Sequence, residues 1–267
     1  MTEPAMDPGP VRARKDLFDL GGTHAVVTGA AGGIGRSAAT ALAAYGARMT
    51  LFDVREDQLQ ATAEAVERAG GTATAIVGDV TSSADREALL AATGGDREPV
   101  SVLVNCAGIV RRSAITEMSL GDLDALWDVN VRGTVAMTLA FLPQMIELGR
   151  GKVINLGSLG SVTGLEQRTA YATSKGAVAL FTRSLAHEVG RFGICVNAIA
   201  PGYMETEMTM GWIHGDGDRT AQLLGRMPLG RFGTPSDVDG LVVFLASGGS
   251  DYLTGQVIML DGGWMTS

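Results

Sequence analysis

A tyrosine and a lysine four residues apart, Tyr171 and Lys175, form a pattern suited to proton transfer. Side chains at this spacing lie on one face of a helix. A free phenol, with a pKa near ~10, is a poor base at neutral pH, but a neighbouring ammonium group favours the phenolate. Ser158, 13 residues before the tyrosine, can hold a substrate oxygen. The three residues predict acid–base chemistry on an oxygen-bearing substrate.

A glycine-rich segment near the start of the chain, 28–35, reads Thr-Gly-Ala-Ala-Gly-Gly-Ile-Gly. It follows a short apolar run and precedes an alanine-rich helical pattern. Glycines in this position let backbone N–H groups approach a pyrophosphate, and the helix N-terminus adds partial positive charge. Glycine also serves ordinary turns, but its place between a first strand and a first helix favours dinucleotide binding.

An acidic residue, Asp53, ends the second apolar run 18 residues after Gly35. A carboxylate near this distance accepts hydrogen bonds from the adenosine ribose and repels a 2′-phosphate. The sequence therefore predicts NAD rather than NADP as cofactor. Arg36 and Arg55 lie nearby, in directions that the sequence does not fix. The alternative is that Asp53 is an ordinary N-cap of the next helix.

Apolar, strand-like runs alternate with helical patterns along the chain, which predicts one doubly wound (Rossmann-type) α/β domain. The runs are apolar throughout rather than alternating, as a parallel sheet of about seven strands covered on both faces requires. The predicted strands are His24–Thr28, Ala47–Asp53, Thr72–Gly78, Val100–Val104, Lys152–Leu156, Ile194–Ala200 and Gln256–Leu260. The predicted helices are Gly33–Tyr45, Arg55–Ala69, Ala84–Ala92, Leu120–Leu148, Ala170–Phe192 and Pro235–Ala246.

The domain is expected to span residues 17–267, after a flexible tail over 1–16. No segment rich enough in proline, glycine or serine divides it. One irregular stretch, residues 202–230, carries short helical patterns and is expected to form a lid over the substrate.

Composition excludes several classes of function. The 37 glycines lack the three-residue period of collagen, and 46% hydrophobic residues exclude a disordered chain. A net charge of −8 makes nucleic acid and membrane surfaces poor partners. The three histidines are scattered, so we expect no metal site. Two cysteines without a pairing framework, Cys106 and Cys195, suit a reducing cytoplasm.

Over about residues 17–265 the chain resembles the short-chain dehydrogenase/reductase family. The glycine segment, Asn105-Cys106-Ala107-Gly108, Asn130, Ser158 and the Tyr171/Lys175 pair match the family's motifs in order. Cys106 departs from the family's second asparagine, which we interpret as a change in packing. The resemblance implies a cofactor site formed by Gly29, Gly32, Gly33, Ile34, Gly35, Asp53, Asp79, Val80, Asn105, Ala107, Gly108, Tyr171, Lys175, Pro201, Gly202, Met204 and Thr206.

The resemblance also implies reversible hydride transfer between a secondary alcohol or ketone and a nicotinamide ring. Tyr171 would remove the alcohol proton in oxidation and donate it in reduction. Ser158 would hydrogen-bond the substrate oxygen, and Lys175 the nicotinamide ribose. Asn130 would support a water chain leading to Lys175.

Two adjacent arginines, Arg111 and Arg112, follow the Asn-Cys-Ala-Gly segment and suit an anionic substrate. They are equally compatible with a solvated surface. Together with residues 200–209, 226–233 and 261–264, they resemble the sugar-acid branch of the family, which includes gluconate 5-dehydrogenases and 2-deoxy-gluconate 3-dehydrogenases. Arg112 is favoured as the substrate ligand. Gln167 and Tyr203 are further pocket candidates, although Tyr203 equally suits packing beneath the lid.

Three other functions stay open at this point. A 3-oxoacyl-[acyl-carrier-protein] reductase is the main alternative, although Asp53 and the acidic net charge disfavour it. The others are a polyol or secondary-alcohol dehydrogenase of broad range and a cofactor-binding regulator without catalysis. Excess apolar positions on two of the helices, with the resemblance, indicate a homotetramer.

Overall fold

The computed structural model describes residues 17–94 and 99–266 of the chain. The tail predicted over residues 1–16 lies outside these ranges.

The strands in the described part of the chain form one seven-stranded sheet in the order β3-β2-β1-β4-β5-β6-β7. Every neighbouring pair is parallel. The strands are β1 (His24–Thr28), β2 (Arg48–Asp53), β3 (Thr72–Val77), β4 (Val100–Asn105), β5 (Gly151–Leu156), β6 (Ile194–Pro201) and β7 (Val257–Leu260). The doubly wound parallel fold is confirmed, and each predicted strand is found within one residue at either end.

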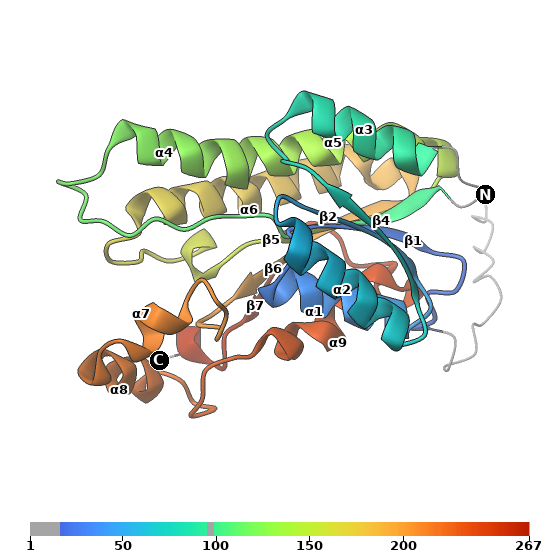
Figure 1. Cartoon of the computed structure of the whole chain (residues 1–267). Helices are drawn as coiled ribbons and strands as arrows, with labels where there is room; N and C mark the ends of the chain where they lie inside the picture. The colour runs from blue at the N-terminus through green and yellow to red at the C-terminus, as the bar shows by residue number, and fades with distance from the viewer. Residues whose placement is uncertain (1–16, 95–98, 267) are drawn as a thin grey trace, which may run out of the picture.

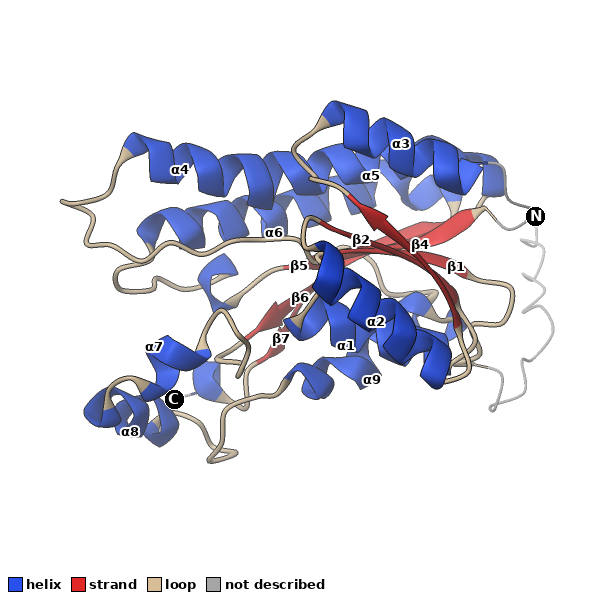
Figure 2. Cartoon of the chain, in the orientation of Figure 1, coloured by secondary structure: helices blue, strands red, loops and turns tan. Residues whose placement is uncertain are grey.

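Helices cover both faces of the sheet (Figures 1 and 2). One face carries α1 (Gly33–Ala44), α2 (Glu56–Arg68) and α9 (Asp239–Ala246). The other carries α3 (Ser83–Gly94), α4 (Leu120–Trp127), α5 (Thr134–Leu148) and α6 (Thr169–Val189). The short helices α7 (Met210–His214) and α8 (Gly217–Gly225) lie apart from both layers, beyond the ends of β5–β7 (Figure 1).

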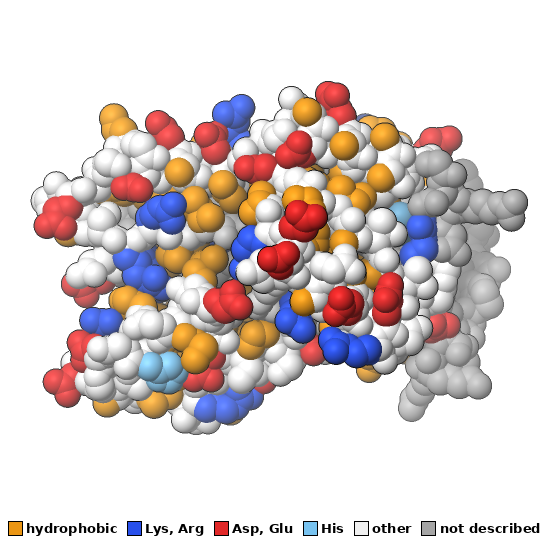
Figure 3. Space-filling view, viewed as in Figure 1, with side chains coloured by type: hydrophobic (Ala, Val, Ile, Leu, Met, Phe, Trp, Pro, Cys, Tyr) orange, Lys and Arg blue, Asp and Glu red, His pale blue; other side chains and the backbone are white. Residues whose placement is uncertain are grey.

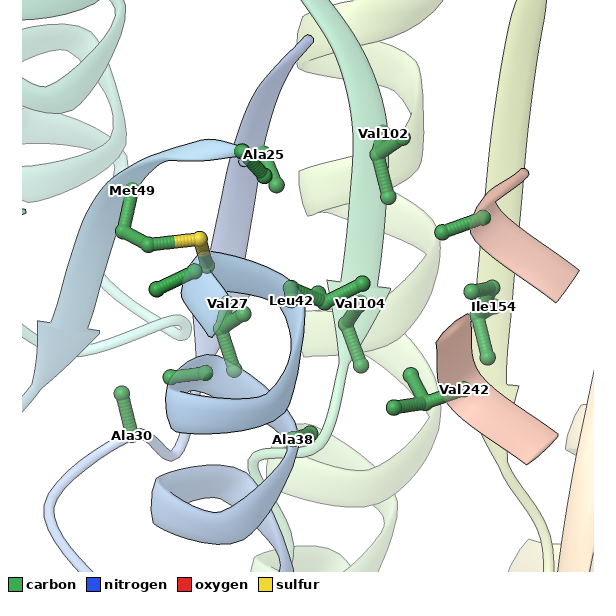
Figure 4. Packing of buried hydrophobic residues seen from close by; sticks show 14 of the residues in the cluster. Ala25, Val27, Ala30, Ala38, Leu42, Met49, Val102, Val104, Ile154 and Val242 are labelled. Carbon is green, nitrogen blue, oxygen red and sulfur yellow. The ribbon is translucent and has the colours of Figure 1, made fainter. Parts of the chain in front are cut away.

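The central strands are buried on both faces, which explains why their sequences are continuously apolar. On β1, Ala25 and Val27 pack in the cluster that contains α1 and α9, whereas Val26 packs with α5 and α6. Figure 4 shows the first of these clusters, in which Leu42 of α1 and Val242 of α9 approach the same strands. Each layer of helices therefore buries the apolar side chains on one face of the sheet.

The outer strand β3 departs from the predicted apolar pattern. Its residues alternate between exposed and half-buried, and Val77 is exposed. β3 pairs only with β2 at the edge of the sheet, where its side chains are only partly covered. The sequence did not distinguish an edge strand from a central one because Thr72–Val77 has the same β-branched composition.

The predicted helix Leu120–Leu148 is interrupted. A π-helical turn, Asp128–Gly133, separates α4 from α5. Such a turn inserts an extra residue and changes which side chains face inward, a feature often found at functional sites. Here the turn carries the fully buried Asn130. The helices predicted at 170–192 and 235–246 also differ, since 3-10 turns form Gly190–Phe192 and Pro235–Val238.

A buried polar chain links the centre of the sheet to the helices α5 and α6. The Asn105 amide on β4 donates to Thr138 of α5 at 3.0 Å and to Asn155 of β5 at 2.9 Å. The Asn155 amide donates in turn to the hydroxyl of Thr182 on α6 at 2.9 Å. Such bonds fix helix positions because unpaired buried polar groups are costly. They hold α6, which carries Tyr171 and Lys175, in register with β5.

Replacing Thr182 by valine tests this link. The variant keeps the side-chain shape but leaves the buried Asn155 amide without its acceptor, which we expect to lower the free energy of unfolding by about 1–3 kcal/mol. Thr40→Val is the matched control. Both hydroxyls donate to the carbonyl four residues earlier in a helix, but that of Thr40 is exposed and supports no other group. Urea denaturation measures both; equal losses would contradict a special role for the buried chain.

Candidate active site

A cavity of about 550 Å³ opens at the carboxyl ends of the strands. Its size suits a small-molecule or cofactor site. It brings together Ser158, Tyr171 and Lys175 with residues predicted to bind the cofactor. Those in its lining are Gly29, Gly32, Gly33, Ile34, Gly35, Asp53, Asp79, Val80, Ala107, Gly108, Tyr171, Lys175, Pro201, Gly202, Met204 and Thr206.

Two glycines of the segment, Gly29 and Gly35, lie where the backbone leaves no room for a side chain. A Cβ on Gly29, whose φ is +66°, would stand 2.7 Å from the backbone nitrogen of Ala107. A Cβ on Gly35 would overlap the carbonyl oxygen of Gly29. The residues thus form an open backbone cradle at the N-terminus of α1, where N–H groups and the helix dipole favour a phosphate. This arrangement fits the pyrophosphate of a dinucleotide.

Asp53 stands at the end of β2 with its carboxylate in the cavity lining. One oxygen accepts the N–H of Ala31 and the other accepts the N–H of Arg55, each at 3.0 Å. It is not the N-cap of α2, since that position is Arg55. Asp53 therefore joins the glycine segment to the start of α2 within the lining of the cavity.

Two charged residues not predicted for the site also line this end of the cavity. Arg55 contacts Asp53, with Nε 3.4 Å from Oδ1, and Glu207, with Nη1 3.3 Å from Oε2. A Cβ on Gly32 would lie 3.2 Å from the Arg55 guanidinium, so this group covers the glycine segment. The only signal for Arg55 in the sequence was its closeness to Asp53. No local pattern pointed to Glu207.

Asn105 is the one predicted cofactor residue that does not line the cavity. Its amide is used in the buried chain between β4, β5 and α5, below the floor of the site. The neighbouring Cys106 does line the cavity, and burial raises the pKa of its thiol to about 12. The thiol therefore stays protonated at physiological pH and acts as a small apolar group.

Lys175 is buried on α6, where its ammonium donates to the carbonyl of Leu156 at 2.7 Å. The nitrogen lies 5.9 Å from the centroid of the Tyr171 ring. Burial lowers the pKa of Lys175 to about 8, so its charged form is less favoured here than in water. The helical spacing thus brings the two side chains together as predicted.

Burial is the largest influence on the pKa of Tyr171, rather than the positive charge of Lys175 that the sequence suggested. Burial of the phenol raises the pKa of Tyr171 above its ordinary value. A hydrogen bond with Ser158 and the positive charges of Arg168 and Arg112 act in the opposite direction.

Asn130 lies in the π-helical turn and is fully buried. Its amide nitrogen donates to Ile109 O and Ser174 Oγ at 3.0 Å, and its oxygen accepts the N–H of Ile109 at 2.8 Å. A Cβ on Gly108 would meet the Asn130 oxygen at 3.2 Å and the Lys175 nitrogen at 3.5 Å. Asn130 thus fixes the chain after β4 directly beside Lys175.

Of the predicted substrate residues, Ser158 and Tyr171 line the cavity, whereas Arg112, Gln167 and Tyr203 are not part of its lining. Arg112 is half-buried near Tyr171, whereas the exposed Arg111 pairs with Asp122 at 3.6 Å. The side chain of Gln167 is exposed. Tyr203 is buried and stacks on Trp212, with ring centroids 5.9 Å apart, which matches the alternative of packing beneath the predicted lid.

Residues 17–94 and 99–266 contain neither a candidate metal-binding cluster nor a membrane-spanning helix. No group of three or more histidine, cysteine, aspartate or glutamate side chains there is placed to hold a metal ion. His24, for example, is buried in β1, with Nε2 2.8 Å from the hydroxyl of Thr50. No helix of that part is long and apolar enough to cross a bilayer. Acidic and basic side chains are interspersed on the face shown in Figure 3.

A family model described as enoyl-(acyl carrier protein) reductase matches residues 29–265. The chain belongs to the short-chain dehydrogenase/reductase family. The sequence is 38% identical to 5-keto-D-gluconate 5-reductase of Escherichia coli K12, over 94% of this chain and 99% of the relative. It is 40% identical to galactitol 2-dehydrogenase (L-tagatose-forming) of Cereibacter sphaeroides, over 94% and 98%.

Among solved structures, a gluconate 5-dehydrogenase from Burkholderia cenocepacia in complex with NADP and tartrate superposes with a TM-score of 0.90. It is 34% identical, with 94% of this chain and 98% of that chain covered. The predicted resemblance to this family and to its sugar-acid branch is confirmed. This short-chain dehydrogenase/reductase is therefore an oxidoreductase that acts on CH–OH groups with NAD(P).

Removing the phenolic hydroxyl tests the role of Tyr171. We expect Tyr171→Phe to lower kcat by about 10²–10⁴-fold, the usual range for a group that transfers a proton in the transition state. Cofactor affinity, followed by nicotinamide fluorescence, should stay within about twofold, since the cradle at the first helix is untouched. Tyr252→Phe, at a fully exposed tyrosine, is the matched control. Near-normal turnover of the Tyr171 variant would exclude this assignment.

Proposed function

We propose that this enzyme interconverts a secondary alcohol and a ketone on a sugar acid, and that it prefers NAD to NADP. The observation that carries the substrate class is the position of Arg112. Its guanidinium lies close enough to lower the pKa of Tyr171, and no carboxylate of the described residues lies within the 4.0 Å of an ion pair. A half-buried cation without a counter-charge suits an anionic ligand. The names of the gluconate-type relatives support the same class.

In the proposed reaction, a bound nicotinamide ring accepts or supplies the hydride. Tyr171 takes the hydroxyl proton in oxidation and returns it in reduction. Ser158, whose hydroxyl lowers the pKa of that phenol, also hydrogen-bonds the reacting oxygen. Lys175 would hold the ribose of a bound nicotinamide nucleotide, and Asn130 keeps the backbone beside Lys175 in place.

We propose NAD on the basis of the charges around Arg55. Two carboxylates, those of Asp53 and Glu207, share this one guanidinium, which leaves the site with a net negative charge. A 2′-phosphate would be repelled there, whereas ribose hydroxyls can donate to Asp53. The relative solved with NADP shows that nucleotide in a related protein. The balance between Arg55 and its two acidic partners is then what decides the cofactor in this chain.

We also propose that the protein is a homotetramer of the cytoplasm. Leu139 of α5 and Leu180 of α6 are more than half exposed on helices that cover one face of the sheet, which favours an interface between copies. Both cysteines are free thiols, which suits a reducing compartment. Light scattering measures the assembly directly.

A substrate panel tests the proposed function. We expect the highest kcat/KM among D-gluconate-type acids, lower values for neutral polyols and the lowest for 3-oxoacyl esters, because only an acid engages Arg112. The last class represents the alternative, a 3-oxoacyl-[acyl-carrier-protein] reductase. The description of the matching family model also names a reductase that acts on acyl carrier protein substrates. A preference for 3-oxoacyl esters would overturn the proposal, and a preference for polyols would retain the reaction but reject the sugar acid.

Cofactor choice is tested by neutralising one acid at a time. Glu207→Gln frees the Arg55 guanidinium and should raise the ratio of kcat/KM with NADP to that with NAD about two- to fivefold, as expected for an exposed pair. Asp53→Asn should raise it by about tenfold or more. Glu205→Gln is the control, because this nearby acid pairs with His214 instead. An unchanged ratio in both test variants would show that these charges do not select the cofactor.

A further inference from the structure

A second arginine, Arg168, lies beside Arg112 although the two are far apart in the sequence. Arg112 follows β4, and Arg168 is the N-cap residue of α6. The Nε atoms of both are buried and have no hydrogen-bond partner. Within the part of the chain that the structure describes, neither guanidinium lies within 4.0 Å of a carboxylate. Buried polar atoms of this kind are costly unless a hydrogen-bond partner satisfies them.

Both arginines contact the aromatic ring of Trp212 on α7. The guanidinium carbons of Arg168 and Arg112 lie 4.8 and 5.0 Å from its ring centroid, within the range of cation–π attraction. Tyr203 stacks on the same indole, and its hydroxyl accepts a hydrogen bond from Arg168 at 2.9 Å. A third arginine, Arg219, lies 4.9 Å from the centroid but is paired with Asp216.

The closeness of the two positive charges affects the pKa of Arg112. Burial and, second, the charge of Arg168 lower the pKa of Arg112. Both guanidinium groups also lower the pKa of Tyr171, so they stand close to the reacting hydroxyl. An anion between them would offset their repulsion and lie within reach of the catalytic centre.

The backbone at Gln167 holds this pair together. It is the only non-glycine residue of the described chain with a positive φ, at +55°. Its carbonyl accepts the N–H of Ser113 at 3.0 Å. These two residues adjoin Arg168 and Arg112 respectively, so this one bond sets the spacing of the arginines. A left-handed backbone at a non-glycine residue is strained and persists only where surrounding contacts hold it.

We propose that Arg168 and Arg112 together clamp the carboxylate of the substrate, with Trp212 as their platform and the Gln167–Ser113 bond as their spacer. This inference rests on the proposed function and adds a residue that selects acids over neutral polyols. Arg168 precedes Tyr171 by one helical turn, so the clamp fixes the distance from the carboxylate to the reacting carbon. Two guanidinium forks on one carboxylate select for charge as well as for length.

Arg168→Gln tests the clamp against D-gluconate and against D-glucitol, its neutral alditol of the same length. We expect kcat/KM for gluconate to fall about 10- to 100-fold, the effect of losing a hydrogen bond to a charged group. The value for glucitol should change less than about threefold. Arg168→Lys should restore part of the loss on gluconate. Arg219→Gln, which removes the paired arginine from the same indole, is the matched control and should leave the ratio of the two substrates unchanged.

Inhibition by succinate, a carboxylate without a hydroxyl to oxidise, provides a second measurement. With glucitol as substrate, succinate should inhibit the parent enzyme and lose affinity about tenfold or more in Arg168→Gln. Equal losses on gluconate and glucitol, with unchanged succinate inhibition, would show that Arg168 is only structural and would overturn the clamp. If the parent enzyme instead uses glucitol but not gluconate, the proposed function fails while succinate inhibition still reports on the clamp.

The spacer is tested at Gln167, whose side chain is exposed. Gln167→Gly accepts the positive φ and should keep the gluconate-to-glucitol ratio of the parent enzyme. Gln167→Val, with a β-branched residue in the same conformation, should raise KM for gluconate without a comparable change in kcat for glucitol. The same ratio in both variants would remove Gln167 from the proposal and leave the arginines to be judged on their own tests.

Discussion

The close contact between the ends of β1 and β4 is the constraint on which the rest of the site depends. The hydroxyl of Thr28 accepts the N–H groups of both Cys106 and Ala107 at 3.1 Å, and Gly29 approaches the same backbone so tightly that it has no room for a Cβ. The strand order reverses at this point, because the chain builds outward from β1 to β3 and then returns to β4. Ligands of open parallel sheets bind at such a reversal, where the loops after the two strands part in opposite directions.

The helices that deliver the catalytic groups are tied to this point by buried hydrogen bonds rather than by apolar packing alone. The chain from Asn105 through Asn155 to Thr182 sets the position of α6, while Asn130 in the π-helical turn braces the backbone after β4. Apolar contacts tolerate small shifts, whereas a hydrogen bond weakens steeply with misalignment. This difference explains why polar side chains occupy the centre of an otherwise apolar sheet. They lie below Tyr171 and Lys175, where a small misplacement of proton-transferring groups would lower the reaction rate most.

The charge balance differs between the part of the cavity around Arg55 and the region around Arg112 and Arg168, which lies outside the cavity lining. At the adenosine end, two carboxylates surround one arginine, and the excess is negative. At the substrate end, Arg112 and Arg168 have no carboxylate partner among the described residues, and the excess is positive. Tyr171 lies between, where burial raises the pKa of the phenol and the arginines partly offset this effect. In the proposed function, the first region would disfavour a 2′-phosphate and the second would attract a carboxylate, although the protein as a whole is acidic.

The sequence by itself determined the features that depend on near neighbours. Strand and helix positions follow from local periodicity, the glycine segment from its place between a strand and a helix, and the pairing of Tyr171 with Lys175 from helical spacing. Tertiary structure alone decided what depends on distant segments. The exposure of β3 follows from its place at the sheet edge, and the use of Asn105 within the sheet follows from the strands beside it. The meeting of Arg168 with Arg112, and of Arg55 with Glu207, joins residues whose separation along the chain hides any pattern. Contacts between charged residues far apart in the sequence produce no periodic sequence pattern, because their interaction energy arises only once the chain has folded.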